Sequence, residues 1–293
     1  MRLKGFLLRK TVPALIIVVG IAIAAYPYIS NEAYMRHASS VTADSEGSMR
    51  NASDEEIAEL KKQAARYNES LSEKVGVLSD PFDENVIRRA PEGYEKQLSV
   101  SGGTVMGEIV IPEIDVNLPI YHGTSQTVLQ EGCGHLEGSS LPVGGKDTHC
   151  VITGHTGLRD KRMFTDLELL RKGDVFYLSV LGERLYYRII SMSVVLPGET
   201  DSLGIREGED LCTLVTCTPY GVNDHRLLVT GKRCSAPENE EGTVSGKRNG
   251  SRWMRDYETC IVTGLVLSLA LVATDTIIRK KNDRKRKKGR GIT

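Results

Sequence analysis

The sequence predicts a mainly β domain, a closed barrel or a sandwich, that is joined to two membrane-spanning helices. Three features lead to this prediction: short strand-like runs in the middle of the chain, an amphipathic helical pattern before them, and an uncharged apolar run near each end. Gly, Pro and Asp separate the strand-like runs, and one helical stretch at residues 163–171 interrupts them. The predicted strands cover residues 107–111, 116–121, 148–153, 174–180, 184–195, 211–216 and 226–231.

The first apolar run, residues 11–29, has 19 residues and no charge. That length spans a bilayer core of about 30 Å. Four basic side chains in residues 1–10 predict that the N-terminus is cytoplasmic. A cleaved signal peptide is the alternative, but the run is longer than a usual signal peptide's and no small-x-small site follows it at once. We therefore expect an uncleaved signal anchor.

The second apolar run covers residues 259–274, and Ile277 and Ile278 extend it into a predicted span of residues 257–278. Trp253 and Tyr257 lie where interfacial aromatic side chains are expected. The tail that follows, residues 279–293, carries nine basic side chains and predicts a second cytoplasmic end. Two spans with both termini inside place residues 30–255 outside the cell.

Between the spans, residues 30–52 are polar and are predicted to form a stalk, and residues 30–96 together precede the β domain at residues 97–233. Ser53 and Glu56 form a capping box, which predicts a helix start. An apolar stripe at helical spacing follows, and we expect it to pack on the β domain. The stripe consists of Ile57, Leu60, Ala64, Tyr67 and Leu71. Residues 234–256 are rich in Gly, Ser, Glu and Asn and are predicted to be a flexible linker.

The charge distribution excludes some classes of function. Residues 30–257 carry 35 acidic and 25 basic side chains, so the part outside the membrane is acidic and is not expected to bind nucleic acid. No set of side chains has zinc or calcium spacing, and no Gly-rich phosphate loop is present, so we expect neither a metal nor a cofactor.

The segment Thr-Leu-Val-Thr-Cys-Thr-Pro-Tyr-Gly, residues 213–221, places Cys217 where a predicted strand enters a turn. A cysteine there is expected to be partly exposed, and nearby positive charge would favour its reactive thiolate. Cys217 is therefore the candidate nucleophile. A buried structural cysteine is the alternative, for which Cys212 is the better candidate.

Two further side chains complete the candidate site. His155 follows the predicted strand at 148–153 in the sequence Thr-Gly-His, and could pair with the thiolate as an imidazolium and protonate a leaving amine. Arg226 begins a strand nine residues after Cys217 and could stabilise an oxyanion. A cysteine, a histidine and an arginine at strand ends are the parts of a thiol acyl-transfer site. The other histidines examined are expected to lie at the surface or to serve packing: His122, His135, His149 and His225.

The remaining extracellular cysteines leave a question open. Disulfide pairing and small buried thiols are both compatible with the sequence, and spacing cannot decide between them. The cysteines concerned are Cys133, Cys150, Cys212 and Cys234.

The motif around Cys217, with Arg226 downstream and Thr-Gly-His upstream, resembles the sortases of Gram-positive bacteria over about residues 53–233. The resemblance is strongest to class C, the pilus-assembling sortases. Residues 135–145 resemble the class C loop before the histidine strand, and a second span near the C-terminus also fits that class. Asp80, Pro81 and Phe82 match the class C lid, which would cover about residues 78–90.

This resemblance implies an eight-stranded sortase-type barrel with short helices and a cysteine transpeptidase activity. The thiolate of Cys217 would cleave a Leu-Pro-x-Thr-Gly-like sorting signal between Thr and Gly, and a lysine amine of another pilin would resolve the thioacyl intermediate. His155 would be the acid/base, Arg226 would stabilise substrate or oxyanion, and Thr216 would help to bind the signal. The implied partners are pilin subunits with C-terminal sorting signals.

The resemblance also implies how the lid works. Asp80 would pair with Arg226 and Phe82 would cover Cys217, so that opening regulates access. Two departures from the family pattern are present: Asp224 stands where an uncharged residue is common, and Phe82 stands where Trp is common.

Three alternatives remain at this stage. One is a sortase that anchors surface proteins to peptidoglycan, with a cell-wall precursor as partner. A second is an inactive scaffold subunit of a pilus complex, which the presence of Cys217, His155 and Arg226 argues against. The third, an L,D-transpeptidase, places its arginine almost next to the cysteine, unlike this chain.

Overall fold

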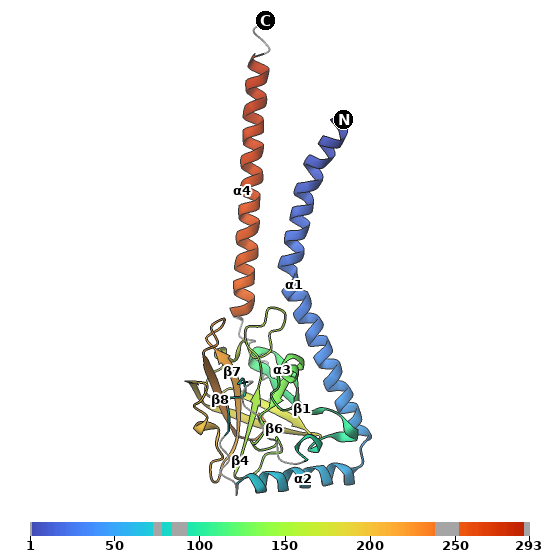
Figure 1. The fold of residues 1–293 in the computed structure, drawn as a ribbon, viewed down its shortest axis with the longest axis vertical. Coiled ribbons are helices and arrows are strands. Elements are labelled where there is room, and N and C mark those ends of the chain that lie inside the picture. Colours follow the sequence, from blue (N-terminus) through green and yellow to red (C-terminus); the bar gives the residue numbers. More distant parts are fainter. Residues whose placement is uncertain (1, 73–77, 84–92, 238–251, 290–293) are drawn as a thin grey trace. The chain divides into compact units, whose positions relative to one another are not determined.

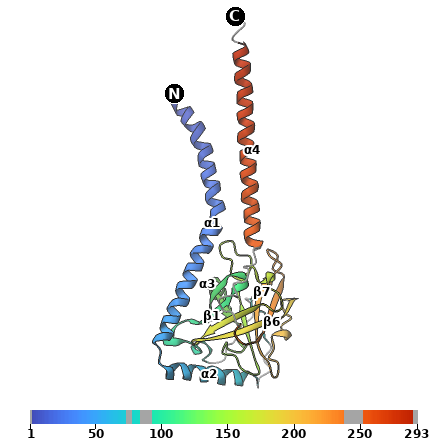
Figure 2. The same ribbon diagram turned by 180° about the vertical axis from the view of Figure 1, so that it is seen from behind.

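The computed structural model describes residues 2–72, 78–83, 93–237 and 252–289 (Figures 1 and 2). It divides the chain into two compact units. One consists of Met1–Ala24 and Arg252–Thr293, and the other consists of Ala25–Ser251. The four α-helices are α1 (Arg2–Asn51), α2 (Asp54–Ser72), α3 (Gln126–Glu131) and α4 (Arg252–Gly289).

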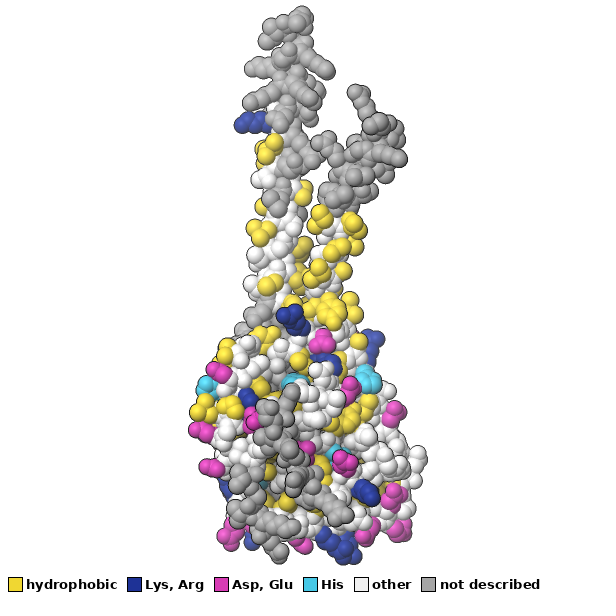
Figure 3. Space-filling model, in the orientation of Figure 1, with side chains coloured by type: hydrophobic (Ala, Val, Ile, Leu, Met, Phe, Trp, Pro, Cys, Tyr) yellow, Lys and Arg dark blue, Asp and Glu magenta, His cyan; other side chains and the backbone are white. Residues whose placement is uncertain are grey.

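The first unit contains the N-terminal part of α1 and the whole of α4. Within the described residues, two helical segments are long and apolar enough to cross a membrane: Leu15–Asn51 and Tyr257–Thr274. Their apolar side chains are exposed rather than packed in a core (Figure 3). Both predicted apolar runs therefore lie on helices. The side chain of Trp253, predicted to be interfacial, is not among the side chains that the structure describes.

The predicted stalk is a continuation of α1, which runs as one helix to Asn51. From Ala25 onward it belongs to the second unit. Tyr34, Ala38 and Thr42 recur every four residues and are 7%, 1% and 7% exposed, so they form one buried stripe. The polar segment after the first apolar run is thus a docked helix and not a free tether.

The predicted amphipathic helix is α2, and it begins as the capping box indicates. The Oγ of Ser53 accepts a hydrogen bond from the backbone N–H of Glu56 at 3.1 Å. Ala64 and Tyr67 are buried, so the helix packs on its own domain. The side chain of Asn68 fixes the contact, because it donates to Leu141 O at 3.1 Å and accepts from Leu141 N at 2.7 Å.

The β domain is a closed eight-stranded barrel with the order β1-β2-β3-β4-β7-β8-β6-β5. Two neighbouring pairs, β2–β3 and β4–β7, are parallel, and the other pairs are antiparallel. Closure leaves no free sheet edge. The strands are β1 (Val105–Ile111), β2 (Val116–His122), β3 (Cys133–His135), β4 (Thr148–Thr153), β5 (Val175–Val180), β6 (Glu183–Val195), β7 (Asp210–Thr218) and β8 (His225–Arg233).

All seven strands predicted from the residues are present, and the eight-stranded barrel that the resemblance implied is confirmed. The strand β3 and the short helix α3 were not predicted. The helix predicted at residues 163–171 is wrong, because only a 3₁₀ turn, Leu167–Leu169, forms there. Met163 has φ +40°, which an α-helix does not allow. The other 3₁₀ turns are Tyr94–Lys96, Val100–Gly102, Pro112–Ile114 and Asp201–Leu203.

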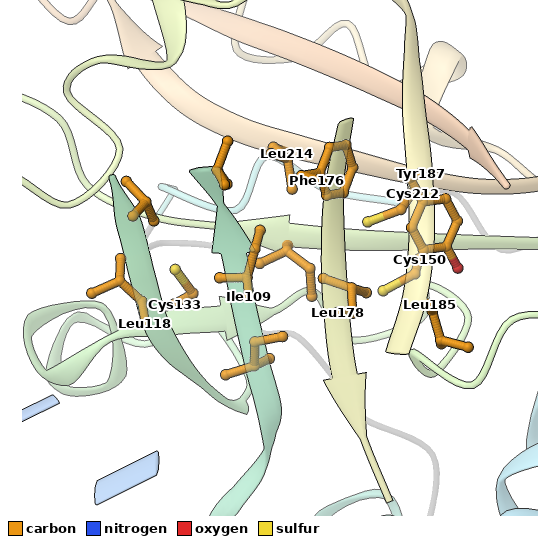
Figure 4. Close-up of a cluster of buried hydrophobic side chains, with 14 of the residues drawn as sticks. Ile109, Leu118, Cys133, Cys150, Phe176, Leu178, Leu185, Tyr187, Cys212 and Leu214 are labelled. Atoms are coloured by element: carbon orange, nitrogen blue, oxygen red, sulfur yellow. The ribbon is translucent and has the colours of Figure 1, made fainter. Parts of the chain in front are cut away.

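Two apolar clusters cover the two faces of the sheet. The main core fills the barrel, where Phe176 and Tyr187 stack with ring centroids 5.6 Å apart (Figure 4). A second cluster lies on the opposite face of β4, β7 and β8, and Val151, Val215 and Leu228 form its base. Because both faces of β4 are covered, all six of its residues are buried.

Loss of the Asn68 side chain should destabilise the α2 contact. In Asn68→Ala, the buried N–H and C=O of Leu141 each lose a partner, and we expect the free energy of unfolding to fall by about 3 kcal/mol. Denaturant unfolding of the full chain in detergent measures this. Gln63→Ala on the same helix removes only an exposed contact with Glu59 and should change stability by less than about 0.5 kcal/mol. Equal stabilities of the two variants would contradict the assignment.

Candidate active site

The strands β7 and β8 bring Cys217 and Arg226 together. The two residues are direct partners in the antiparallel ladder, so their side chains project from the same face of the sheet. That face is the outer one, because side chains two apart on a strand share a face: Cys217 lies on the side of Val215 and Arg226 on the side of Leu228, both in the second apolar cluster. Cys217 is partly buried, and Arg226 is 9% exposed. The candidate nucleophile and cation therefore share one surface at the end of the barrel.

The parallel pairing of β4 with β7 brings His155 to the same level. Thr153 pairs with Val215, and the N–H of Gly154 donates to Val215 O at 3.1 Å. Continuing this register sets His155 opposite Cys217. The Oγ1 of Thr216 donates to Gly154 O at 2.7 Å, which adds a second hydrogen bond between β7 and the residue before His155. The three predicted residues thus lie at the ends of three neighbouring strands.

Backbone geometry around His155 is tightly specified. The ring of Phe164 lies against Gly154, where an added Cβ would come within 2.7 Å of it, so only glycine fits before the histidine. The N–H of Phe164 donates to His155 O at 3.0 Å. The imidazole is partly buried, and its Nε2 has no hydrogen-bond partner among the described residues. That nitrogen is available for proton transfer to or from a bound substrate.

The predicted lid residues lie over this site. The carboxylate of Asp80 accepts two hydrogen bonds from Arg226, from Nε at 2.8 Å and Nη2 at 2.7 Å. Both side chains are largely buried, so this is a bidentate ion pair with little solvent screening. Pro81 and Phe82 form the turn that follows. The pairing of Asp80 with Arg226 that the resemblance implied is present.

The ring of Phe82 contacts both Arg226 and His155. Its ring centroid is 5.0 Å from the guanidinium carbon of Arg226 and 5.9 Å from the centroid of the His155 ring. Phe82 and Leu78 also pack on the second apolar cluster, and Thr200 donates to Leu78 O at 2.7 Å. Residues 84–90 of the predicted lid lie outside the described residues. In its described part, the lid covers the face on which Cys217 and Arg226 lie.

The electrostatics of this closed arrangement differ from the sequence prediction. Burial raises the pKa of Cys217 to about 11; the charge of Arg226 lowers this pKa in part, and the charge of Asp80 raises it by a smaller amount. Burial and the charge of Lys161 lower the pKa of His155. Both effects favour a neutral thiol beside a neutral imidazole. With the lid in place, these two pKa shifts work against the expected thiolate–imidazolium pair, mainly because both side chains are buried.

Thr216 points to the other face of β7 from Cys217 and is 2% exposed. Its hydroxyl is occupied by the carbonyl of Gly154. Its visible effect is to align the end of β4, which carries His155. A direct contact of Thr216 with a sorting signal stays a prediction.

The other histidines have structural partners, as expected. His135 bonds to Tyr94 Oη at 2.8 Å, and His149 bonds to Thr213 Oγ1 at 2.7 Å. His122 bonds to Gln97 O at 2.7 Å. On the surface, His225 pairs with Asp224 at 2.8 Å. The unusual acidic residue at 224 therefore faces its neighbour and does not compete with Asp80 for Arg226.

All six cysteines are free thiols. Cys150 and Cys212 are buried neighbours in the register of β4 and β7, and Cys133 is also buried. Within the described part of the chain, no group of three or more His, Cys, Asp or Glu side chains could hold a metal ion.

Two parts of the site were missed from the sequence. The second apolar cluster is one: all six residues of β4 are buried, although Thr and His occur among them, so the sequence does not show that both faces of this strand are covered. The other is Lys161, whose charge acts on His155. No local pattern marks that lysine, because it reaches the site only through an irregular loop.

Known proteins that resemble this chain are sortases, as the geometry of the site also suggests. Residues 109–234 match the sortase domain family. Sortase A of Streptococcus agalactiae is 31% identical over 154 residues, which are 50% of this chain and 62% of that protein, so the chain spans less than two thirds of this relative.

Solved structures cover more of the chain. The crystal structure of sortase C-1 from Actinomyces oris is 50% identical and has a TM-score of 0.59; the match covers 62% of this chain and 99% of that one. A pilus-related sortase C of Group B Streptococcus is 42% identical with a TM-score of 0.61, over 68% of this chain and 98% of that one. The fold is a closed eight-stranded barrel with a cysteine, a histidine and an arginine at one end, and its sequence matches the sortase domain. The chain belongs to the sortase family, and its structural neighbours are class C pilus sortases.

Removing the lid charge should activate the thiol. In Asp80→Asn, the negative charge that disfavours the thiolate is lost while side-chain size is kept, so the pKa of Cys217 should fall below about 11. A drop of about one unit would raise alkylation at pH 8 about tenfold. The pH dependence of iodoacetamide labelling, followed at Cys217 by peptide mass mapping, measures it. Asp224→Asn, which alters an exposed carboxylate paired with His225, is the control. An unchanged profile in Asp80→Asn would contradict the electrostatic role of the lid.

Proposed function

We propose that this chain is a membrane-anchored sortase that polymerises pilin subunits. Its substrate would be a Leu-Pro-x-Thr-Gly-like sorting signal, cleaved between Thr and Gly, and its acceptor a lysine amine of a second pilin. The observation that carries the proposal is the buried Asp80–Arg226 pair with Phe82 over His155, on a barrel that is similar to pilus-related sortases. That arrangement is a thiol acyl-transfer site held shut by its own chain.

The first half-reaction follows from the positions of the three side chains. With the lid displaced, Cys217 loses the Asp80 charge and gains solvent, so its thiolate becomes accessible. The sulfur attacks the carbonyl carbon of the signal threonine. Arg226, released from Asp80, donates hydrogen bonds to the oxyanion that develops. His155, which took up the proton of the Cys217 thiol when the thiolate formed, delivers that proton to the nitrogen of the departing glycine, the C–N bond breaks, and a thioester on Cys217 remains.

The second half-reaction reverses these roles. A lysine amine attacks the thioester carbon, and Arg226 again stabilises the oxyanion. The C–S bond breaks, the thiolate of Cys217 leaves, and an amide bond joins the two pilins. His155 accepts the proton that the attacking amine loses. One imidazole can serve both steps because its Nε2 carries no other hydrogen bond among the described residues.

The lid supplies the gate in this proposal. A bidentate ion pair and an aromatic contact must both break before a substrate carbonyl reaches Arg226. The binding of a sorting signal must therefore offset their loss. This requirement favours a substrate with extended contacts to the site over an isolated water molecule or a small peptide.

The membrane arrangement completes the proposal. The segments at residues 11–29 and 257–278 would cross the membrane, with both termini in the cytoplasm and residues 30–255 outside. The N-terminal span would remain as an anchor. This topology puts the catalytic domain, residues 97–233, where exported pilins carry their sorting signals. Residues 234–256 would be the linker between that domain and the second span.

Anchoring of proteins to peptidoglycan is the second candidate within the family, with a cell-wall amine as acceptor. The lid residues favour the pilus enzyme, because Asp80 and Phe82 occupy the positions that the class C pattern assigns to them. A scaffold subunit without activity has no use for an unpartnered imidazole beside a cysteine that an ion-paired lid covers.

The proposal predicts a covalent adduct. The full chain in detergent, incubated with a Leu-Pro-x-Thr-Gly peptide, should gain the mass of the acyl fragment, as recorded by intact-mass spectrometry. Cys217→Ala should gain none. Asp80→Ala combined with Phe82→Ala should accumulate the adduct at least tenfold faster, since the ion pair and the ring no longer block Arg226 and His155.

A matched control and a second peptide sharpen this test. Asp224→Ala with Val222→Ala changes one exposed acid and one exposed apolar side chain on the neighbouring loop, and should leave the adduct rate unchanged. A peptide without the threonine–glycine bond should not react. The thioacyl mechanism is wrong if the lid-open variant forms no adduct, or if Cys217→Ala forms it as well.

A further inference from the structure

The loop after His155 lacks regular secondary structure, although it carries a side chain that needs an exact position. From Gly154 to Met163 the chain forms neither helix nor strand. Its shape depends on single contacts, such as the N–H of Gly157 with Thr165 Oγ1 at 3.1 Å. A segment of this kind keeps one conformation only when its surroundings specify it.

The docked part of α1 provides two of these contacts. Asn31 Oδ1 accepts a hydrogen bond from the backbone N–H of Arg162 at 2.9 Å. One turn later, the ring of Tyr34 lies 4.8 Å from Lys161 Nζ. The hydroxyl of Tyr34, which is 7% exposed, donates to Glu131 O at 3.2 Å and fixes the ring. All of these residues belong to the second unit, Ala25–Ser251.

The site of contact is a strained part of the loop. Met163 follows Arg162 and has φ +40°, a region that costs a non-glycine residue about 1 kcal/mol or more. Its side chain is 1% exposed in the barrel core. The guanidinium of Arg162 pairs with the buried Asp166. Asn31 therefore holds a turn that would relax if it were released.

The loop transmits this constraint to His155 over a short distance. The carbonyl of Arg162 accepts from Thr165 N at 2.9 Å, and the N–H of the adjacent Phe164 donates to His155 O. The Phe164 ring also lies against Gly154. A shift at Arg162 is thus expected to displace Phe164, whose N–H and ring both hold the backbone at Gly154 and His155.

Plain packing is the simpler explanation of the α1 contact. The stripe of Tyr34, Ala38 and Thr42 would account for adhesion of the helix to the barrel. It does not account for a polar side chain that reaches a single backbone N–H of the His155 loop, nor for a ring placed against the lysine whose charge acts on His155. Both specific contacts converge on residues 161 and 162.

We propose that Asn31 and Tyr34 are positioning residues for His155, and that α1 is a working part of the catalytic unit as well as its tether. The proposal rests on the function proposed above. Release of the loop moves the imidazole away from the leaving amine, and a misplacement of about 1 Å costs on the order of 100-fold in rate. The peptide still binds, because neither side chain lies at the face of Cys217 and Arg226.

The test uses the full chain in detergent, in the lid-open background of Asp80→Ala with Phe82→Ala. Single-turnover formation of the acyl adduct is measured against peptide concentration. We expect Asn31→Ala and Tyr34→Ala to lower the maximal rate at least tenfold and to leave the half-saturating concentration within twofold. Asn31→Asp keeps an acceptor oxygen and Tyr34→Phe keeps the ring, so both should retain most of the rate.

Two controls on the same helix separate positioning from adhesion. Thr42→Ala trims the buried stripe away from the loop, and Arg36→Ala removes an exposed pair with Glu32. Both should acylate at the parental rate. The inference is overturned if Asn31→Ala acylates normally, if Thr42→Ala slows the reaction equally, or if only the half-saturating concentration changes.

Hydrogen–deuterium exchange gives a readout that does not depend on activity. Peptides covering residues 155–166 should exchange faster in Asn31→Ala and Tyr34→Ala than in Thr42→Ala. Unchanged exchange overturns the positioning role even if the rates differ. Should the parent form no adduct at all, the proposed function fails, while exchange still decides whether α1 holds the loop.

Discussion

The parallel pairing of β4 with β7 is the constraint on which the candidate site depends. Parallel neighbours end at the same edge of a sheet, so the residue that follows β4 and the last residues of β7 come to one level. Antiparallel β8 then returns from that edge with Arg226 opposite Cys217. Three side chains that are 62 and 9 residues apart along the chain are thereby set by backbone hydrogen bonds, with no contact needed among the side chains themselves.

Apolar side chains cover both faces of these strands, and those on the outer face form the surface on which the lid packs. The barrel core lies under one face, and the base of Val151, Val215 and Leu228 lies on the other. An apolar patch beside an active site attracts an apolar cover, and Leu78 and Phe82 supply it from the same chain. The closed site then suppresses its own nucleophile, because the cover that buries Cys217 also brings the charge of Asp80. In the proposed function, one movement of the lid would control both access to Cys217 and its reactivity.

The sequence predicts those features that depend on local pattern. The capping box at Ser53, the strands of the barrel and the turn after Cys217 all have signals within a few residues. The strand β3 has only three residues, which is too short for an alternating pattern of apolar and polar side chains to be recognised. Residues 163–171 have apolar side chains at helical spacing because they line the core, and burial alone produces that spacing in an irregular loop.

The protonation state of the site could not be predicted, because it arises from contacts between distant segments. A turn cysteine near an arginine indicates a thiolate only while nothing else approaches, and Asp80 comes from 146 residues before Arg226. Family resemblance supplied that pair, whereas the contact of α1 with the His155 loop has no such precedent in the motif. Asn31 lies just after an apolar run, where a polar residue is expected simply as the end of a span. Its hydrogen bond to Arg162 is the basis for the second role proposed for this position, and residues 25–51 of α1 belong to the same unit as the candidate histidine.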